Sequence, residues 1–488
     1  MKKVIYISFF LMCAALSSCS NFLEESSQDL MIPKSVKDYK ELFFGEVMKN
    51  GEILHPYLEY MTDDVADQCY YGSSPMLISN DWRESVWSYY TWQQNPEVGI
   101  SNEFTADAAW TSYFHKILMT NIILDGIYDM TGTEEERIDL AGEAYFMRAF
   151  SYFMLANLYG RPYDPATADK DLCVPINDEI SLSDKMMKRA TNAAVYSKIE
   201  SDIIRAIQCF KSTDSKKGIF RPNLAGAYLL ASRISLFRKD YPQTILYSDS
   251  VIKNAPQGLN KLPEEKSNNS VFLSYSNKEI LFSYGTTTLE SYMQKDFTYK
   301  GNLVVATDLI AQYDEADLRL SHYFHHTKGS QRRPVKKDIE FYIPAKWSRT
   351  SSTVYSNAFR LAEAYLNRAE AYAELGNTEK ALADINTLRD HRMKTGTPHL
   401  TVDNDGIVAT VRKERRRELA FEGFRWFDLR RYGCPPLEHT YSSTETEGAG
   451  DKIKLEDKEL YILPIPKSER DRNTMIEIFN RPTNDPIK

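Results

Sequence analysis

The stretch "RLAEAYLNRAEAYAELGNTEKALADINTLRDHR", residues 360–392, has the clearest helical pattern of this chain. Its first half repeats apolar and small side chains at the i, i+4, i+8 and i+11 spacing of one helix face. These side chains are Leu361, Tyr365, Ala369 and Tyr372. The pattern predicts an amphipathic helix that buries this face.

A second helix is predicted directly after the first. Gly376 is typical of the left-handed residue that ends a helix, and Asn377 or Thr378 can cap the helix that follows. Ala381 and Ile385 then belong to the buried stripe of that second helix. The order of small and large residues has the spacing of a tetratricopeptide repeat, a helical hairpin whose small residues let its helices approach closely.

Weaker copies of the helical pattern occur at residues 110–127, 141–160 and 224–252. The remaining stretches are rich in turn residues, and only pieces such as "KEILFSY" and "ELYILPIP" have the composition of strands. We therefore predict a mainly α fold, in which a tetratricopeptide-like helical hairpin scaffold carries long irregular loops and a few short strands. The scaffold is expected at about residues 105–255 and 356–433, and the irregular segments at residues 28–104 and 256–355.

The N-terminus has the pattern of a secretory signal. Two lysines precede an apolar run at residues 4–16, which is too short to span a bilayer. The run ends in "LSSC", which resembles the lipobox of bacterial lipoproteins, where the cysteine after the cleavage site is acylated. We predict that residues 1–18 are a signal peptide and that Cys19 carries the lipid anchor; the alternative is a plain secretory cleavage after Ser18.

The composition is that of an ordinary globular protein, with 42% hydrophobic and 26% charged residues. The net charge of −8 argues against a nucleic-acid partner, because a duplex binder needs a surplus of Lys and Arg. Four of the six cysteines lie outside the predicted signal and lipidation site, at Cys69, Cys173, Cys209 and Cys434. Their spacing fits neither a disulfide framework nor a zinc site, so we expect free, buried thiols.

Three of the six tryptophans lie five residues apart in "SNDWRESVWSYYTWQQN", residues 79–95. A step of five turns a helix by about 140° beyond a full turn and alternates faces on a strand, so one regular element cannot bury all three rings together. An aromatic ring can instead stack on the C–H face of a sugar while nearby polar groups bond its hydroxyls. We predict such a platform on an irregular surface segment; the alternative is that the rings fill gaps under long loops.

Motifs along the whole chain together resemble one family, the SusD/RagB-like outer-membrane nutrient-binding lipoproteins. They are "CSNFLEES" at residues 19–26, Trp110 with "YFHKI" and Asn121, "GEAYFMRAFSYFMLANLYGRPY" at 142–163, "YDEADLRLSHYF" at 313–324, the hairpin above, "ERRRELAFEGFRWFDLRRYG" at 414–433 and "LPIPKSERDRN" at 463–473. Each motif alone is modest evidence, whereas their order along the chain is specific. The ending "EIFNRPTN", residues 477–484, departs from the usual pattern of the family.

The resemblance implies a single SusD-like domain at residues 19–488 with no catalytic activity. No cofactor and no metal-binding residue are predicted. It implies a glycan-binding lipoprotein on the outer face of the outer membrane that captures an oligosaccharide and delivers it to a SusC-like TonB-dependent transporter. The helical scaffold would face the transporter, and the irregular segments would form the ligand platform. Two alternatives remain: a peptide-binding member of the same family, and a helical-repeat scaffold that binds only proteins, which as an intracellular protein would need no signal peptide.

The predicted ligand-binding residues all lie in the irregular segments. They are Asp64, Arg83, Trp87, Trp92, Asn95, Tyr292 and Trp347. Asp64 is included because its place upstream of Trp87 resembles the acidic and aromatic pair of glycan-binding relatives. Tyr292 and Trp347 would form the opposite wall, whereas Trp110 and Trp426 lie in helical motifs and are expected in the core.

Other charged patterns are given structural interpretations. The stretch "RKERRREL", residues 412–419, alternates acids and bases at helical spacing, which favours a helix with internal ion pairs. The stretch "HYFHH", residues 322–326, has no cysteine nearby, which argues against a metal site there. The stretch "VDNDG", residues 402–406, lacks the end carboxylates of a calcium loop, which favours a turn. Asp63 and Asp64 are adjacent, which does not by itself make the two-carboxylate geometry of a glycosidase.

Overall fold

The computed structural model describes most of the chain after the predicted signal. The described residues are 33–48, 55, 57–67, 86–99, 104, 107–180, 186–213, 217–255, 257–267, 270–284, 303–331, 337–347, 357–402, 405–441 and 451–484. The predicted signal peptide, Cys19, Cys69, Trp82, Arg83 and Tyr292 lie outside them. In the part that is described, no helix has both the length and the apolar composition needed to cross a membrane.

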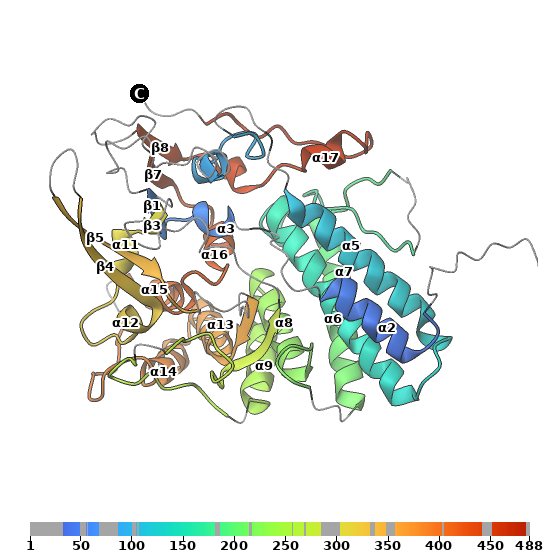
Figure 1. The fold of residues 1–488 in the computed structure, drawn as a ribbon, viewed down its shortest axis with the longest axis horizontal. Helices are drawn as coiled ribbons and strands as arrows, with labels where there is room; N and C mark the ends of the chain where they lie inside the picture. Colours follow the sequence, from blue (N-terminus) through green and yellow to red (C-terminus); the bar gives the residue numbers. More distant parts are fainter. Residues whose placement is uncertain are drawn as a thin grey trace, which may run out of the picture.

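Helices dominate the structure, which confirms the predicted fold class (Figure 1). The main helices are α2 (Val36–Leu42), α3 (Tyr57–Tyr60), α5 (Ala108–Asp125), α6 (Glu134–Tyr159), α7 (Asn192–Ser212), α8 (Leu224–Phe237), α9 (Tyr241–Lys253), α11 (Thr307–Ile310), α12 (Arg319–Tyr323), α13 (Leu361–Glu374), α14 (Thr378–Arg389), α15 (Ile407–Leu419), α16 (Arg425–Arg431) and α17 (Lys467–Arg470). Shorter turns of helix are η3 (Phe43–Val47), η4 (Gly126–Tyr128) and η5 (Lys458–Tyr461).

The strands of the described residues form antiparallel pairs. The pairs are β1 (Val65–Asp67) with β3 (Leu303–Val305), β2 (Ile280–Tyr284) with β6 (Asn357–Arg360), β4 (Phe324–Gln331) with β5 (Lys337–Pro344), and β7 (Leu437–Tyr441) with β8 (Asp451–Leu455). In Figure 1 all pairs except β2–β6 lie on the left side of the molecule, away from α5, α6 and α7.

The predicted helical hairpin is confirmed as α13 and α14. Gly376 has φ +76, the left-handed conformation expected after a helix end, and the Asn377 side chain accepts a hydrogen bond from the Lys380 N–H at 3.1 Å. Ala369 and Ala381 are fully buried between the two helices, in a cluster that includes Val411 of α15. Small side chains at the crossing therefore allow close packing, as the sequence pattern predicts.

Helix α6 ends at Tyr159, one residue before the predicted end at Gly160. Its last carbonyls lack partners within the helix, and buried arginines from distant segments bond them. Arg189 donates to the Tyr159 carbonyl at 3.1 Å, and Arg430 of α16 donates to the carbonyl of Gly160. The negative end of the helix dipole favours cations at this place. The helix end thus joins the N-terminal helices to the C-terminal half.

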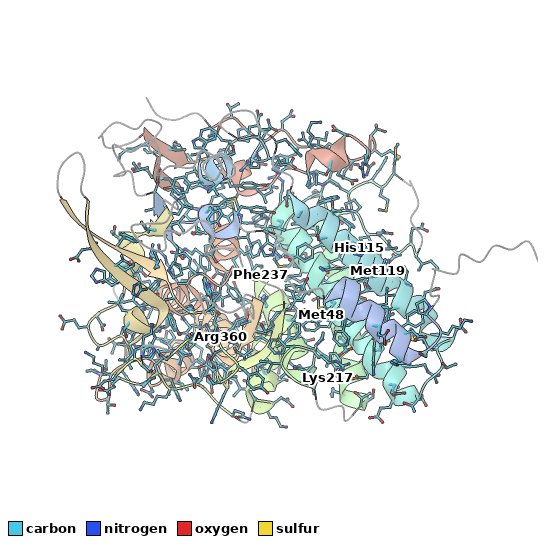
Figure 2. The ribbon with its side chains drawn as sticks, viewed as in Figure 1. Met48, His115, Met119, Lys217, Phe237 and Arg360 are labelled. Carbon is cyan, nitrogen blue, oxygen red and sulfur yellow. The ribbon has the colours of Figure 1, made fainter. Side chains whose placement is uncertain are left out.

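The helix predicted at residues 412–419 is confirmed as part of α15, but most of its ion pairs are not internal. The i, i+3 pair of Arg417 with Glu414 is internal, whereas Glu418 contacts three arginines from other elements. These arginines are Arg319, Arg360 and Arg392, and all three are completely buried. Figure 2 labels Arg360 among the side chains of the C-terminal half.

This cluster forms the charge core, defined as Glu279, Glu414, Glu418 and Glu422 with Arg319, Lys346, Arg360 and Arg392. Arg360 donates to Glu418 at 2.9 Å and to Glu422 at 2.7 Å, while Arg392 donates to Glu279 at 2.6 Å. Burial opposes ionisation of Glu422, but Arg360 and Lys346 outweigh it and lower the pKa of this carboxyl. The charge core joins strands β2 and β6 to helices α12 and α15.

The strand predictions have mixed outcomes. The piece "KEILFSY" contains β2, as predicted, whereas "ELYILPIP" begins in η5 and continues without a strand partner. Pro464 and Pro466 have no N–H to give to a ladder, which explains why this piece cannot pair as a strand. The long hairpin β4–β5 lies in a segment expected to be irregular, where the sequence predicted no strand.

Candidate functional site

An open groove of about 670 Å³ lies where three of the strand pairs meet. Its lining comes from β1, β3, β5 and β7, and from the start of α11. Ala66 and Val304 of the first pair pack against Phe341 and Ile343 of β5 in a small apolar cluster. The strands therefore hold each other in place without a continuous sheet.

Carboxylates line the groove. Asp67 lies on β1, Asp308 on α11, Glu340 on β5 and Glu438 on β7. The side chains of Glu340 and Glu438 are 54% and 40% exposed, so both can exchange their water for a ligand hydroxyl. Carboxylate oxygens only accept hydrogen bonds, which suits a ligand rich in hydroxyl donors.

Arginines lie behind one wall of the groove. Arg425 binds both oxygens of Asp63 at 2.7 Å, and Arg416 binds Asp308 at 2.8 Å and Asp64 at 2.7 Å. Burial opposes ionisation of Asp63, but Arg425 and Arg416 outweigh it and lower the pKa of this carboxyl. Both arginines are mostly buried, so the carboxylates stand between them and the groove.

Tyr342 of β5 provides an aromatic surface at the groove. Its half-buried ring stacks on His326 of β4, with centroids 4.5 Å apart and planes at 11°. His326 is held in turn by Glu340, 3.2 Å from its Nε2. A ring backed by a second ring is a fixed flat apolar surface, which is what stacking on a sugar needs. These residues are not among the predicted ligand-binding residues, although "EFYI" has the composition of a strand.

The groove also contacts a stack of three rings. His439 of β7 lies between Tyr90 and Trp92, with centroid distances of 4.1 and 4.2 Å. Its Nδ1 is 2.8 Å from the Tyr90 carbonyl oxygen and its Nε2 is 2.9 Å from that of Thr62. Burial lowers the pKa of His439 to about 4, although the two carbonyl contacts favour the protonated ring. Tyr90 and His439 line the groove, whereas Trp92 supports them from behind.

The prediction that Trp92 lies on the surface is therefore wrong. Its ring has no exposed area, and its Nε1 donates to the Met61 carbonyl at 2.9 Å. The spacing of five is compatible with burial because Trp92 has φ 51 and turns the chain just after the helix at residues 86–90. Trp87 of that helix is half-buried against the main core. A completely buried ring has no face to offer a sugar.

Asp64 and Trp347 are also placed differently from the prediction. Asp64 is fully buried and paired with Arg416, and burial raises the pKa of its carboxyl against the effect of this arginine. Trp347 is 5% exposed and belongs to the main core. Asn95 is exposed. Binding by Trp87, Asn95, Arg83 and Tyr292 stays a prediction, the last two being outside the described residues.

The expected core positions of Trp110 and Trp426 are confirmed, at 4% and 1% exposure. Among the described residues, no group of three or more His, Cys, Asp or Glu could hold a metal ion. Cys173, Cys209 and Cys434 are free thiols, of which Cys209 is only half-buried. The adjacent Asp63 and Asp64 are both paired with arginine.

Two family models match this chain. One, described as "SusD family", covers residues 264–480, and the other, described as "Starch-binding associating with outer membrane", covers residues 21–236. A SusD-like protein of Formosa agariphila is 24% identical over 533 residues, with 97% of each chain covered. A second SusD-like protein of that organism is 24% identical over 531 residues, with 97% of this chain and 98% of the relative covered.

Solved structures have the same fold. A SusD superfamily protein from Bacteroides thetaiotaomicron has a TM-score of 0.70 and 22% identity, with 92% of this chain and 100% of that chain covered. A SusD-like carbohydrate binding protein from Bacteroides vulgatus has a TM-score of 0.67 and 18% identity, with 91% and 97% covered. At these identities the likeness shows the fold alone.

Proposed function

Because this chain belongs to the SusD family, we propose that it captures an oligosaccharide at the cell surface and delivers it to a SusC-like TonB-dependent transporter. Proteins of this family bind nutrients and are not enzymes. The same proposal includes cleavage after residue 18, a lipid anchor at Cys19, a single domain at residues 19–488 and a position on the outer face of the membrane. A member of the family that binds peptides is the alternative.

The groove is the observation that carries the glycan proposal. It combines the stacked ring of Tyr342 with the exposed carboxylates of Glu340 and Glu438. A sugar presents an apolar C–H face and a rim of hydroxyl donors, and these match the ring and the carboxylates respectively. A peptide that binds in the same groove would instead need basic side chains of its own to pair with these carboxylates.

Calorimetric titration of the lipid-free protein tests the proposal. A panel of maltoheptaose, laminarihexaose, xylohexaose and mannohexaose is compared with a lysine-rich peptide. Tyr342→Ala should weaken binding of the preferred glycan by about 1–3 kcal/mol, as expected for a stacking hot spot. Tyr275→Ala is the matched control, because this tyrosine is 79% exposed and does not line the groove.

Two outcomes contradict the groove as the glycan site. One is unchanged glycan affinity of Tyr342→Ala, and the other is tight binding of the peptide with no binding of any glycan.

The anchor is tested separately, by labelling cells with a fatty-acid analogue. Label on the wild type and not on Cys19→Ala supports acylation, whereas equal labelling of both contradicts it. Delivery requires that mild detergent extraction recovers the protein together with a large outer-membrane barrel.

A further inference from the structure

The turn that follows the helix at residues 86–90 is strained. Trp92 has φ 51, a left-handed conformation that a bulky side chain rarely adopts because its Cβ approaches the following carbonyl. Such a residue persists only when its surroundings hold it, and residues of this kind concentrate at functional sites. The contacts that hold Trp92 therefore matter for the position of the groove wall.

On its inner side the turn is held by the ring of Trp92. The ring donates from Nε1 to the Met61 carbonyl at 2.9 Å and stacks on His439, which lines the groove. Tyr90 donates its hydroxyl to the Thr440 carbonyl of β7 at 3.0 Å, and accepts from the Asp67 N–H of β1 at 2.9 Å. The position of this turn thus sets how β1 and β7 face each other.

On its outer side the turn is held by residues 481–484, near the C-terminal end of the chain. Asn484 donates from Nδ2 to the Thr91 carbonyl at 2.9 Å, and its own carbonyl accepts from Gln93 Nε2 at 2.8 Å. Gln94 donates from Nε2 to the Arg481 carbonyl at 2.6 Å. The side chains of the turn and of the C-terminal segment therefore bond each other's backbones in both directions.

Arg481 is the central contact of this segment. It is 3% exposed, and it donates to the carbonyls of Gln93 and Leu460, the latter at 2.7 Å. Among the described residues no carboxylate forms an ion pair with it. A buried guanidinium that bonds only backbone carbonyls holds two chain segments at fixed positions, and replacing it leaves those carbonyls without partners.

We propose that Arg481 and Asn484 are positioning residues of the groove. They hold the strained turn at Trp92 from outside, and the stack of Trp92 on His439 carries this constraint to the groove wall. This inference rests on the proposed function, because it assigns these residues a part in glycan binding. It also gives a role to the C-terminal stretch that departs from the family pattern.

The experiment compares Arg481→Gln and Asn484→Ala with wild type by calorimetric titration and by hydrogen–deuterium exchange. The probe is the glycan of highest affinity in the panel above. Both variants should bind it about tenfold more weakly, the effect of losing about 1.4 kcal/mol of binding free energy. Backbone amides at residues 88–95 and 437–441 should exchange faster, while those of α13 and α14 stay unchanged.

Matched variants separate positioning from a general loss of stability. Arg472→Gln replaces an exposed arginine of the same C-terminal region and should change neither affinity nor exchange. Arg481→Lys retains the charge and an N–H donor group, and should recover part of the lost affinity. Asn484→Ala removes a single half-buried side chain, so it is informative even if Arg481→Gln unfolds.

Two results would overturn the inference. One is faster exchange at residues 88–95 with no change at residues 437–441, which would mean that the turn does not act on β7. The other is unchanged glycan affinity in Asn484→Ala despite faster exchange in both segments. If no glycan binds the wild type, the proposed function fails, and the exchange data alone then decide whether the segment constrains the groove wall.

Discussion

Two groups of carboxylates in this protein have opposite surroundings. Glu418 and Glu422 of the charge core are buried and contact guanidinium or ammonium groups from several elements. Glu340 and Glu438 at the groove are 54% and 40% exposed. The buried acids are needed by the fold, because water cannot replace their partners, whereas the groove acids remain available to a ligand.

The difference is one of desolvation. A carboxylate inside the protein has lost its hydration, and only close cations and donors make its ionised form tolerable. Glu418 receives Arg360 at 2.9 Å and Arg392 at 3.0 Å, together with the Tyr323 hydroxyl at 3.0 Å. The exposed pair of Glu438 with Lys452 is still hydrated, and such pairs add little to stability.

Removing one cation from the charge core should have the largest effect on stability. Arg360→Met leaves Glu418 and Glu422 buried with fewer partners, and should lower the free energy of unfolding by about 3–5 kcal/mol. The matched control is Lys452→Met at the exposed pair, with an expected loss of about 0–1 kcal/mol. Denaturant titration measures both, and similar losses for the two variants would remove the distinction between the groups.

Acid should destabilise the protein through the charge core. Arginines lower the pKa of Glu414, Glu418 and Glu422 against the effect of burial, so their ionised forms stabilise the folded state. This stabilisation is fully present above about pH 4.5, the ordinary value for Glu, and is lost as the pH falls toward their lowered values. Melting temperatures from pH 7 to pH 3 should fall steeply below pH 4.5. A flatter acid slope is expected for Glu422→Gln, and an unchanged slope would contradict this account.

Glu59 is a buried acid whose pKa is shifted in the opposite direction, upward. Its carboxylate accepts the Gly423 N–H at 2.7 Å, and burial raises its pKa to about 8, so the neutral acid is favoured in the folded state. The stability contributed by the neutral form is present below about pH 4.5 and is lost as the pH rises through 8. Glu59→Gln should therefore be more stable than wild type at pH 9, by about 1–3 kcal/mol, and similar at pH 4.

The nearby Lys346 also titrates in this range, because burial lowers its pKa to about 8. It is present in both wild type and Glu59→Gln, so the difference between them reports mainly on Glu59. A variant less stable than wild type at pH 9 would mean that Glu59 is ionised and paired, like the acids of the charge core.

The groove acids should give the smallest effect on stability. Glu340→Gln and Glu438→Gln are expected to change the free energy of unfolding by less than about 0.5 kcal/mol, as is usual for surface substitutions. Each should weaken glycan binding by about 1 kcal/mol, roughly fivefold, because an amide accepts a hydroxyl less strongly than a carboxylate. Calorimetry and melting curves measure the two quantities. A loss of stability without a loss of affinity would place these acids with the structural group.

Local patterns in the sequence predicted the helical part of the fold. Each of these patterns involves residues within one or two helical turns, so the helices that they predict depend little on the rest of the chain. The patterns are the buried stripe with Leu361, Ala369 and Ala381, the left-handed Gly376 and the cap at Asn377. The same holds for the end of α6 and for α8 and α9. The family resemblance rested on these segments and on their order, and it is confirmed.

By itself, then, the sequence determined the helical scaffold, the core positions of Trp110 and Trp426, and the family, because periodicity and capping are properties of neighbouring residues. Which polar and aromatic side chains line the groove depends instead on contacts between distant segments. Trp92 is buried because His439, 347 residues further along the chain, covers its ring, and Glu418 is structural because Arg319 and Arg360 reach it from other elements. Such contacts form between segments that are far apart in the sequence, so the residues on either side of each position do not reveal them.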